Sequence, residues 1–360
     1  MAQIDRLLKI LKDKKGSDLH LSPGNPPLGR IGGELIPLEP TPLTAEANKA
    51  LLFEIITAEQ KVNYDKMHDL DFALAVAELE ARFRANVFEG RLGTSAVFRL
   101  IPSQIKSIQQ LGLPESLLRF TDLNKGLVLV TGATGSGKST TLAALVDHIN
   151  QSRREHILTI EDPIEFVYPP CKSLINQREV GPHTESFATA LKAALREDPD
   201  VILVGEMRDL ETIELAITAA ETGHLVFGTL HTSSAAKTVD RIINVFPTGQ
   251  QAQIRAMLAE SLHGVISECL LKSLEGGRVA ALEILIGTPA VSNLIREGKS
   301  FQIPGTIQTG KKDGMLSMEQ AVRNLLDARK ISSEEASSYL PKQDPSSARA
   351  DHREFAGTAR

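Results

Sequence analysis

The sequence is poor in the residues that define several common protein classes. It has two cysteines, Cys171 and Cys269, no tryptophan and 4% aromatic residues among 360. Two distant cysteines without a CxxC pair exclude a disulfide framework and a structural zinc knuckle, and they fit a reducing cytoplasm. No apolar run approaches the ~20 residues of a membrane span, and the N-terminus lacks the apolar block of a secretory signal.

A strong excess of either charge is also missing. The net charge of −5 gives no general attraction to nucleic acid, so no nucleic-acid partner is expected. Hydrophobic residues make up 42% and charged residues 24%, the balance of an ordinary soluble globular protein. The length is sufficient for two domains with separate cores.

Residues 1–100 are predicted to form a mixed α and β domain. Four apolar residues near its start share a helical spacing: Ile4, Leu7, Leu8 and Leu11. A short strand, a hairpin and a helix capped by Thr44 follow. Three antiparallel strands are then predicted from "LDFALAVA", "ARFRANVFEG" and "TSAVFRLI". Residues 101–123 are predicted to be a linker with a short helix near its end.

From residue 124 to residue 340 strands and helices alternate. The predicted strands are "GLVLVTG", "HILTIED", "DVILVGE" and "HLVFGTLH", with amphipathic helices between them. Continuous apolar strands of this kind predict an α/β fold with a mainly parallel sheet covered on both faces. Beyond residue 248 the pattern is mostly helical, with one hairpin. The polar, Pro/Ser-rich tail at 341–360 is expected to be disordered.

The stretch "GATGSGKS" matches the phosphate-binding pattern GxxxxGK[ST] in full. It follows the apolar strand "LVLVT" and opens a helix, the context that this motif requires. Backbone N–H groups of the loop would surround the phosphates of ATP, Lys138 would reach the β- and γ-phosphates, and the Ser139 hydroxyl would bind Mg²⁺. The predicted nucleotide-binding residues are Thr134, Gly135, Ser136, Gly137, Lys138, Ser139 and Thr140.

Carboxylates follow two of the predicted strands. Glu206 follows "VILVG", and "IEDPIE" places Glu161, Asp162 and Glu165 after another strand. Ligands of open α/β sheets gather at the carboxyl ends of the strands, and the phosphate loop marks that edge here. Glu206 is therefore the candidate base for water, and Glu161 a candidate acid beside the metal. Asp162 and Glu165 are weaker candidates, since either could serve only the turn.

Two histidines flank the strand in "TGHLVFGTLHT". His224 precedes it and His231 follows it, so that His231 lies at the predicted active edge. A histidine at a strand end can be a structural hydrogen-bonding group or a functional one. Of the two, His231 is the better candidate for a sensor of the γ-phosphate or of a neighbouring subunit.

The order of the motifs resembles the secretion ATPase superfamily and, more closely, the type IV pilus retraction motors (PilT family). Besides the phosphate loop, the sequence contains the family motifs "EDPIE", "GEMRD" and "TGHLVFGTLHT". Further matching stretches extend over nine-tenths of the chain: "GSDLHL", "FRANVF", "INQREVG", "NLIREGK" and "GMLSMEQA". The resemblance implies a PAS-like N-terminal domain and a RecA-like ATPase domain. It also implies a cytoplasmic homohexamer that acts at the inner membrane through a platform protein at the pilus base, and a catalytic role for Glu206.

The resemblance further implies that arginines of the N-terminal domain contribute to the nucleotide site. The matching positions are Arg82, Arg84, Arg91 and Arg99. An arginine suits this role because its planar charged group pairs with phosphate oxygens, although alternating arginines can also line the solvent face of a strand. Arg208 is expected to brace Glu206 or to bridge subunits.

The sequence departs from the family pattern at three places. Ala133 replaces the usual proline of the phosphate loop, Gly90-Arg91-Leu92 replaces Gln-Arg-Gly, and "AVSNLIRE" carries Val291 and Ser292 in a helix linked to motor output. The first change is expected to have little effect, the second affects how Arg91 is aimed, and the third bears on retraction more than on hydrolysis.

Alternative functions stay open from sequence alone. One is a pilus-assembly or type II secretion ATPase, although the tetracysteine zinc site of those enzymes is missing. Another is an accessory or divergent retraction paralogue. A non-hydrolysing regulatory module is disfavoured by Lys138, Ser139 and Glu206, and a helicase by the acidic charge and the lack of an aromatic, basic platform.

Overall fold

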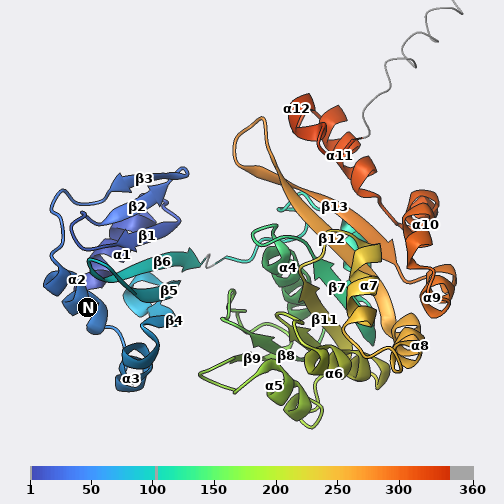
Figure 1. The fold of residues 1–360 in the computed structure, drawn as a ribbon. Coiled ribbons are helices and arrows are strands. Elements are labelled where there is room, and N and C mark those ends of the chain that lie inside the picture. The colour runs from blue at the N-terminus through green and yellow to red at the C-terminus, as the bar shows by residue number, and fades with distance from the viewer. Residues whose placement is uncertain (1, 102–103, 341–360) are drawn as a thin grey trace, which may run out of the picture. The chain divides into compact units, whose positions relative to one another are not determined.

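The computed structural model describes residues 2–101 and 104–340, and they form two compact units (Figure 1). The first unit holds Met1–Ile105 together with Glu161–Pro169 and Glu179–His183, and the second holds the remainder. The predicted domain boundaries and linker stay predictions. The predicted disordered tail, 341–360, lies outside the described residues.

The first unit contains a six-stranded antiparallel sheet with the strand order β3-β2-β1-β6-β5-β4. Its strands are β1 (Asp18–Leu21), β2 (Leu28–Ile31), β3 (Glu34–Pro37), β4 (Asp69–Val76), β5 (Ala81–Gly90) and β6 (Gly93–Ile101). Its helices are α1 (Gln3–Asp13), α2 (Ala45–Phe53), α3 (Ala58–Met67) and the 3₁₀ turn η1 (Ala77–Leu79). The three strands predicted as antiparallel neighbours are confirmed.

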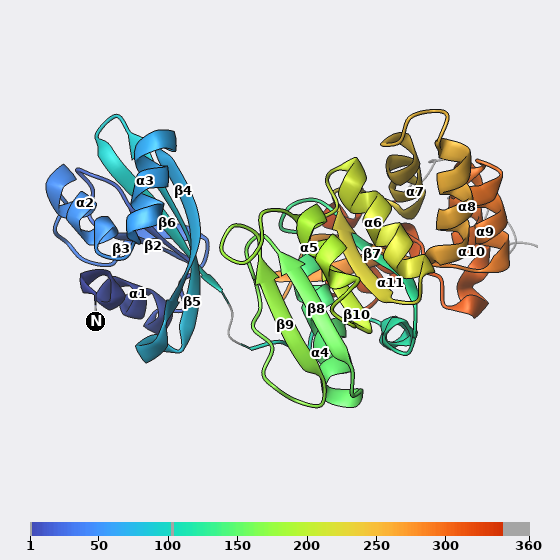
Figure 2. The same cartoon turned by 90° about the horizontal axis from the view of Figure 1, so that it is seen from below.

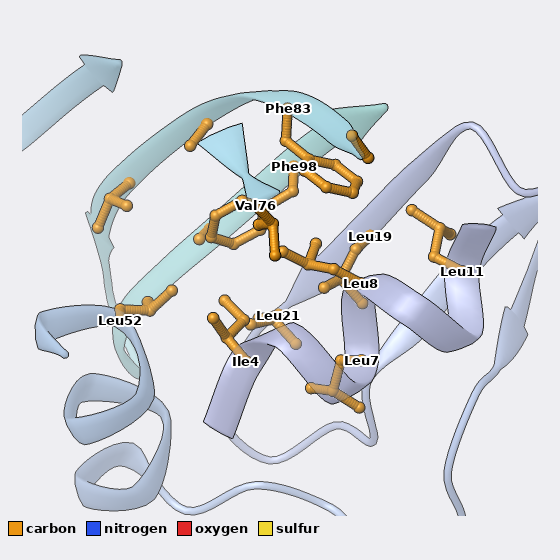
Figure 3. Packing of buried hydrophobic residues seen from close by; sticks show 14 of the residues in the cluster. Ile4, Leu7, Leu8, Leu11, Leu19, Leu21, Leu52, Val76, Phe83 and Phe98 are labelled. Atoms are coloured by element: carbon orange, nitrogen blue, oxygen red, sulfur yellow. The ribbon is translucent and has the colours of Figure 1, made fainter. Parts of the chain in front are cut away.

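Helix α1 packs on this sheet through the apolar face that its spacing predicts. The four predicted residues are at most 2% exposed: Ile4, Leu7, Leu8 and Leu11. They meet Leu19, Phe83 and Phe98 from the sheet (Figure 3). The Thr44 hydroxyl accepts the N–H of Ala47 at 3.1 Å, which confirms Thr44 as the N-cap of α2. Helix α3, which buries only Tyr64, was not predicted.

The second unit is built on a seven-stranded sheet with the order β13-β12-β7-β11-β10-β8-β9. The strands are β7 (Gly126–Thr131), β8 (His156–Glu161), β9 (Leu174–Glu179), β10 (Val201–Val204), β11 (Leu225–Leu230), β12 (Leu262–Lys272) and β13 (Arg278–Ile286). The pairs from β12 through β7, β11 and β10 to β8 are parallel, and β13 is antiparallel to β12. The predicted α/β fold with a mainly parallel sheet is confirmed.

Helices connect and cover these strands, and α8, α9 and α10 gather beside one another (Figure 2). The α-helices are α4 (Lys138–Ser152), α5 (Phe187–Ala194), α6 (Leu210–Glu221), α7 (Ala235–Asn244), α8 (Gln251–Ser261), α9 (Pro289–Arg296), α10 (Ile303–Thr309), α11 (Met318–Asp327) and α12 (Ser333–Ala336). The 3₁₀ helices are η2 (Glu115–Thr121), η3 (Ser300–Gln302) and η4 (Gly310–Asp313). Among the described residues, no helix combines the length and the apolar character of a membrane span.

Candidate functional site: the phosphate loop and the carboxylates beside it

The phosphate loop runs from the end of β7 at Thr131 to the start of α4 at Lys138. Gly132 (φ 149°) and Gly137 (φ 107°) adopt left-handed conformations that favour glycine. The loop therefore turns sharply into a helix N-terminus, where free N–H groups and the helix dipole favour an anion. Thr134 and Gly135 are exposed at its tip, whereas Ser136 is buried.

Lys138 is held inside this loop. Its side chain is 9% exposed, and its Nζ donates to the carbonyls of Gly132 at 3.0 Å and Ala133 at 2.9 Å. These bonds place a buried positive charge at the loop that the sequence predicts to bind phosphate. Ser139 and Thr140, in the first turn of α4, are half-buried beside it. The departure at Ala133 leaves its backbone carbonyl available to Lys138.

Glu206 follows strand β10, which lies between β8 and β11 in the sheet. All four residues of β10 are buried, which confirms the interpretation of Val201–Val204 as a buried strand. Gly205 then donates its N–H to Ile160 O at 2.8 Å, and Met207 donates to Thr229 O at 3.0 Å. Both bonds fix the backbone on either side of Glu206, so its carboxylate is held at the carboxyl edge of the sheet.

The Glu206 carboxylate is engaged by two basic side chains. Arg208 reaches both of its oxygens, with Nε 2.6 Å from Oε1 and a terminal guanidinium nitrogen 2.6 Å from Oε2. His231 Nε2 lies 3.0 Å from Oε1. Partial burial favours a higher pKa for Glu206, but Arg208, His231 and Lys138 outweigh it and hold the pKa below its ordinary value. Glu206 is thus an ionised carboxylate.

The other candidates of this edge have different surroundings. Glu161, the last residue of β8, is buried, and its Oε2 accepts the N–H of Glu165 at 3.3 Å. Asp162 and Glu165 are exposed. His224 lies at the opposite end of β11 from His231, and its Nδ1 is 3.0 Å from the carbonyl of Ala219. This contact joins His224 to the end of α6 and not to the other candidates of the site.

The four candidate arginines belong to the first unit, and three of them form ion pairs there. Arg99 donates to Asp18 at 2.9 Å, Arg84 lies 4.0 Å from Asp71, and Arg82 lies 3.9 Å from Glu179 of the same unit. Arg91 is exposed at the turn between β5 and β6. Arg84 and Arg99 keep 45% and 69% of their side chains exposed, so both have guanidinium surface free for a further contact.

The sequence analysis missed one acid of the site, Glu268. It lies in β12, is 5% exposed, and its Oε2 accepts a hydrogen bond from the Thr141 hydroxyl at 2.9 Å. The sequence feature that could have identified Glu268 is its position as a lone acid within the mainly apolar stretch "HGVISECLL". Its partner is 127 positions away in the sequence, which no local pattern reports.

A magnesium site need not appear as a cluster of protein ligands. No group of three or more His, Cys, Asp or Glu side chains in the described parts of the chain could hold a metal. Mg²⁺ at a phosphate loop uses one or two protein oxygens, waters and the nucleotide phosphates. The Ser139 hydroxyl, in the first turn of α4, is a protein oxygen of that kind.

Comparison with known proteins places the chain in one family. Residues 14–279 match the family described as type II/IV secretion system protein. The chain belongs to this family. It is 52% identical to the type IV pilus retraction ATPase PilT of Pseudomonas aeruginosa PAO1, over 92% of this chain and 96% of that one.

Two further relatives agree with this assignment. A twitching motility protein of Neisseria gonorrhoeae is 52% identical over 86% of the chain and 83% of the relative. The crystal structure of the pilus retraction motor PilT with bound ADP superimposes with a TM-score of 0.88 at 46% identity, covering 96% of this chain and 99% of that one. The predicted resemblance to the retraction motors is confirmed.

Proposed function

We propose that this protein is an ATP-hydrolysing motor that powers type IV pilus retraction and hence twitching motility. The observation that carries the proposal is the 52% identity to a pilus retraction ATPase over nearly the full length of both chains. The intact phosphate loop and the ionised Glu206 at the same sheet edge supply the chemistry that such a motor needs.

The roles of the site residues follow from their surroundings. The loop N–H groups and Lys138 would hold the phosphates of ATP, and the Ser139 hydroxyl would hold Mg²⁺, with Glu161 proposed as a second acid for the metal. Bound Mg²⁺ would supply charge neutralisation on the β- and γ-phosphates. Glu206 would orient the attacking water and accept its proton.

Arg208 and His231 govern when Glu206 can act. Arg208 donates to both carboxylate oxygens and lowers the pKa of Glu206, so this pairing weakens Glu206 as a proton acceptor. The Arg208 side chain is 69% exposed and can swing outward at small cost. His231 lies 3.0 Å from the same carboxylate and would respond to the γ-phosphate of bound ATP.

The wider assembly is part of the same proposal. The chain would act as a homohexamer at the cytoplasmic face of the inner membrane, bound there only through a platform protein at the pilus base. Arg84, Arg91 and Arg99 would serve the nucleotide site of a hexamer. The exposed side chains and the ion pairs of Arg84 and Arg99 support this role.

Retraction is tested in a type IV-piliated host that lacks its own retraction ATPase. The chain should restore twitching zones and shorten fibres seen by live imaging, and the Lys138→Ala variant should restore neither. The complementary experiment expresses the chain in a host that lacks its assembly ATPase. Rescue of fibre formation there, without rescue of retraction, would assign the extension function instead.

The arginine roles are tested by mixing subunits. Arg84→Ala, Arg91→Ala and Arg99→Ala should each leave hexamers intact and slow ATP hydrolysis, because an arginine at the γ-phosphate contributes a factor of about 10³–10⁵ in rate. Mixing one of these variants with Lys138→Ala should restore part of the activity if the arginine acts on a neighbouring subunit. Subunit exchange is verified separately with fluorescently labelled chains; exchange without recovery argues against action between subunits.

A further inference from the structure

Glu268 stands directly behind the phosphate loop. Strand β12 pairs with β7 in parallel register, and Ser267 lies opposite Thr131, the last residue of β7. Glu268 is therefore level with Gly132, where the strand becomes the loop. It is 5% exposed, although carboxylates are rarely so buried without a paired cation.

The loop is packed onto this residue. A Cβ atom on Gly137 would lie 2.5 Å from Glu268 Oε1, and one on Gly132 would lie 2.3 Å from the Glu268 carbonyl oxygen. On the other side of the carboxyl group, Oε2 accepts the hydrogen bond from Thr141 of α4. Glu268 thus contacts both ends of the loop and the first turns of the helix that follows it.

The surroundings of Glu268 decide its charge. Burial raises the pKa of its carboxyl group to about 7, although the Thr141 hydrogen bond and the Lys138 charge act in the opposite direction. Lys138 is the charged group that faces it from the loop. Next to it along β12, burial and more weakly the Glu268 charge raise the pKa of the Cys269 thiol.

The neighbouring strand presents a second acid, which is half-buried, to the opposite face of the sheet. Glu283 of β13 lies opposite Ser267, so its side chain points away from Glu268, and it accepts the N–H of Ala235 at 2.8 Å. Burial raises the pKa of Glu283 as well. It therefore serves as a reference residue: a half-buried acid with a raised pKa, one strand away, whose side chain points to the other face of the sheet.

We propose that Glu268 is a positioning residue for phosphate binding, which supports the loop through Gly137 and Thr141 and sets by its charge how strongly the loop attracts phosphate. This inference rests on the proposed nucleotide-binding function. When Glu268 is neutral, it does not offset the Lys138 charge, which attracts the phosphates. The carboxylate offsets that charge and repels the phosphates, so nucleotide affinity should fall as pH rises through neutrality.

The test is calorimetric titration of the full chain with ADP and Mg²⁺ at several pH values between pH 6 and pH 8, which give both the size and the midpoint of the pH dependence. For the unchanged chain we expect affinity to fall by about tenfold, the size of one added negative charge near the phosphates. In Glu268→Gln, which keeps an acceptor for Thr141 and is neutral at every pH, most of this difference should disappear. ADP itself titrates, but equally for all variants, so the comparison between chains isolates Glu268.

Two further variants complete the experiment. Glu283→Gln should keep the pH dependence of the unchanged chain. Thr141→Val removes a hydrogen bond to the Glu268 carboxyl group, so the midpoint of the pH dependence should move upward, and this holds even if Glu268→Gln does not fold. Equal pH dependence in Glu268→Gln and the unchanged chain, or an unmoved midpoint in Thr141→Val, would overturn the inference. A chain that binds no ADP at any of these pH values contradicts the proposed function itself.

Discussion

Glu206 and Glu268 are two acids at the same edge of one sheet, and their pKa values are shifted in opposite directions. The register places Glu206 level with Leu230 and Thr131, and Glu268 one residue beyond. Three strand spacings separate them, or about 14 Å. The Lys138 charge acts on both. Yet the pKa of Glu206 lies below its ordinary value, and that of Glu268 is raised to about 7.

The difference comes from their nearest partners. Glu206 meets a guanidinium on both oxygens and an imidazole on one, whereas Glu268 has a neutral hydroxyl and the loop glycines. A shared cation at a distance does not compensate for burial, but a bidentate arginine does. A carboxylate that must act as a base is therefore kept ionised, and one that supports a loop can be kept neutral.

The largest expected effect is at Glu206. Glu206→Gln should bind ATP but lose hydrolysis by about 10²–10⁴-fold, because the amide cannot accept a proton from water. Steady-state phosphate release and ATP affinity are measured together, with Glu214→Gln on the exposed face of α6 as the matched control. Hydrolysis at the unchanged rate would reduce Glu206 to an acid that merely caps a strand.

Lys138→Ala tests the cation that both acids share. ATP affinity should fall by about a hundredfold or more, since charged hydrogen bonds to the phosphates are lost. Calorimetry measures the loss, and Lys192→Ala, which removes an exposed lysine of α5, is the control. Unaltered affinity would contradict the assignment of the phosphate loop.

Arg208→Ala removes the partner that keeps Glu206 acidic. Arg208 lowers the pKa of Glu206, so without it this pKa rises. The acid limb of the pH–rate profile should then move to higher pH, with a several-fold loss at pH 5 relative to pH 8. Arg208→Lys keeps the charge without the two-pronged contact and should shift less. An acid limb that does not move would show that Arg208 does not set the ionisation of Glu206.

The smallest effect is on stability. The pKa of Glu268 is raised on folding, so folding holds a proton there and stability falls as pH rises from about 4.5 towards about 7. Glu268→Gln removes this loss. Relative to the unchanged chain it should gain about 2–4 °C in Tm at pH 8 and little at pH 4, as measured by thermal unfolding. An equal difference at both pH values would mean that Glu268 is not neutral in the folded chain.

The local sequence pattern was sufficient to predict the position of Glu206 but not that of Glu268. A short apolar strand followed by glycine and an acid can be read from consecutive residues, and the phosphate loop identifies the active edge. The placement of Glu268 depends on β12 pairing beside β7, a contact between residues more than a hundred positions apart. The sequence predicted a hairpin in this region but not its position next to the loop.

Two elements were missed for a different reason. Strand β9 is an edge strand with exposed and half-buried polar residues, so it lacks the apolar run that marked its neighbours. Helix α3 buries one side chain and therefore has little amphipathic pattern, although Thr57 and Gln60 form a capping box at its start. The partners of the arginines likewise depend on cross-strand register, which the spacing of arginines within one strand does not reveal.

Strand β12 also acts as a partition between two parts of the second unit. Glu268 faces the phosphate loop, while the next residue, Cys269, packs with Leu271 against the apolar cluster of α11 and α12 on the other side. β12 is bonded to β7 on one edge and to β13 on the other, so it cannot shift alone. A displacement of the phosphate loop would therefore act on the C-terminal helices across the thickness of a single strand.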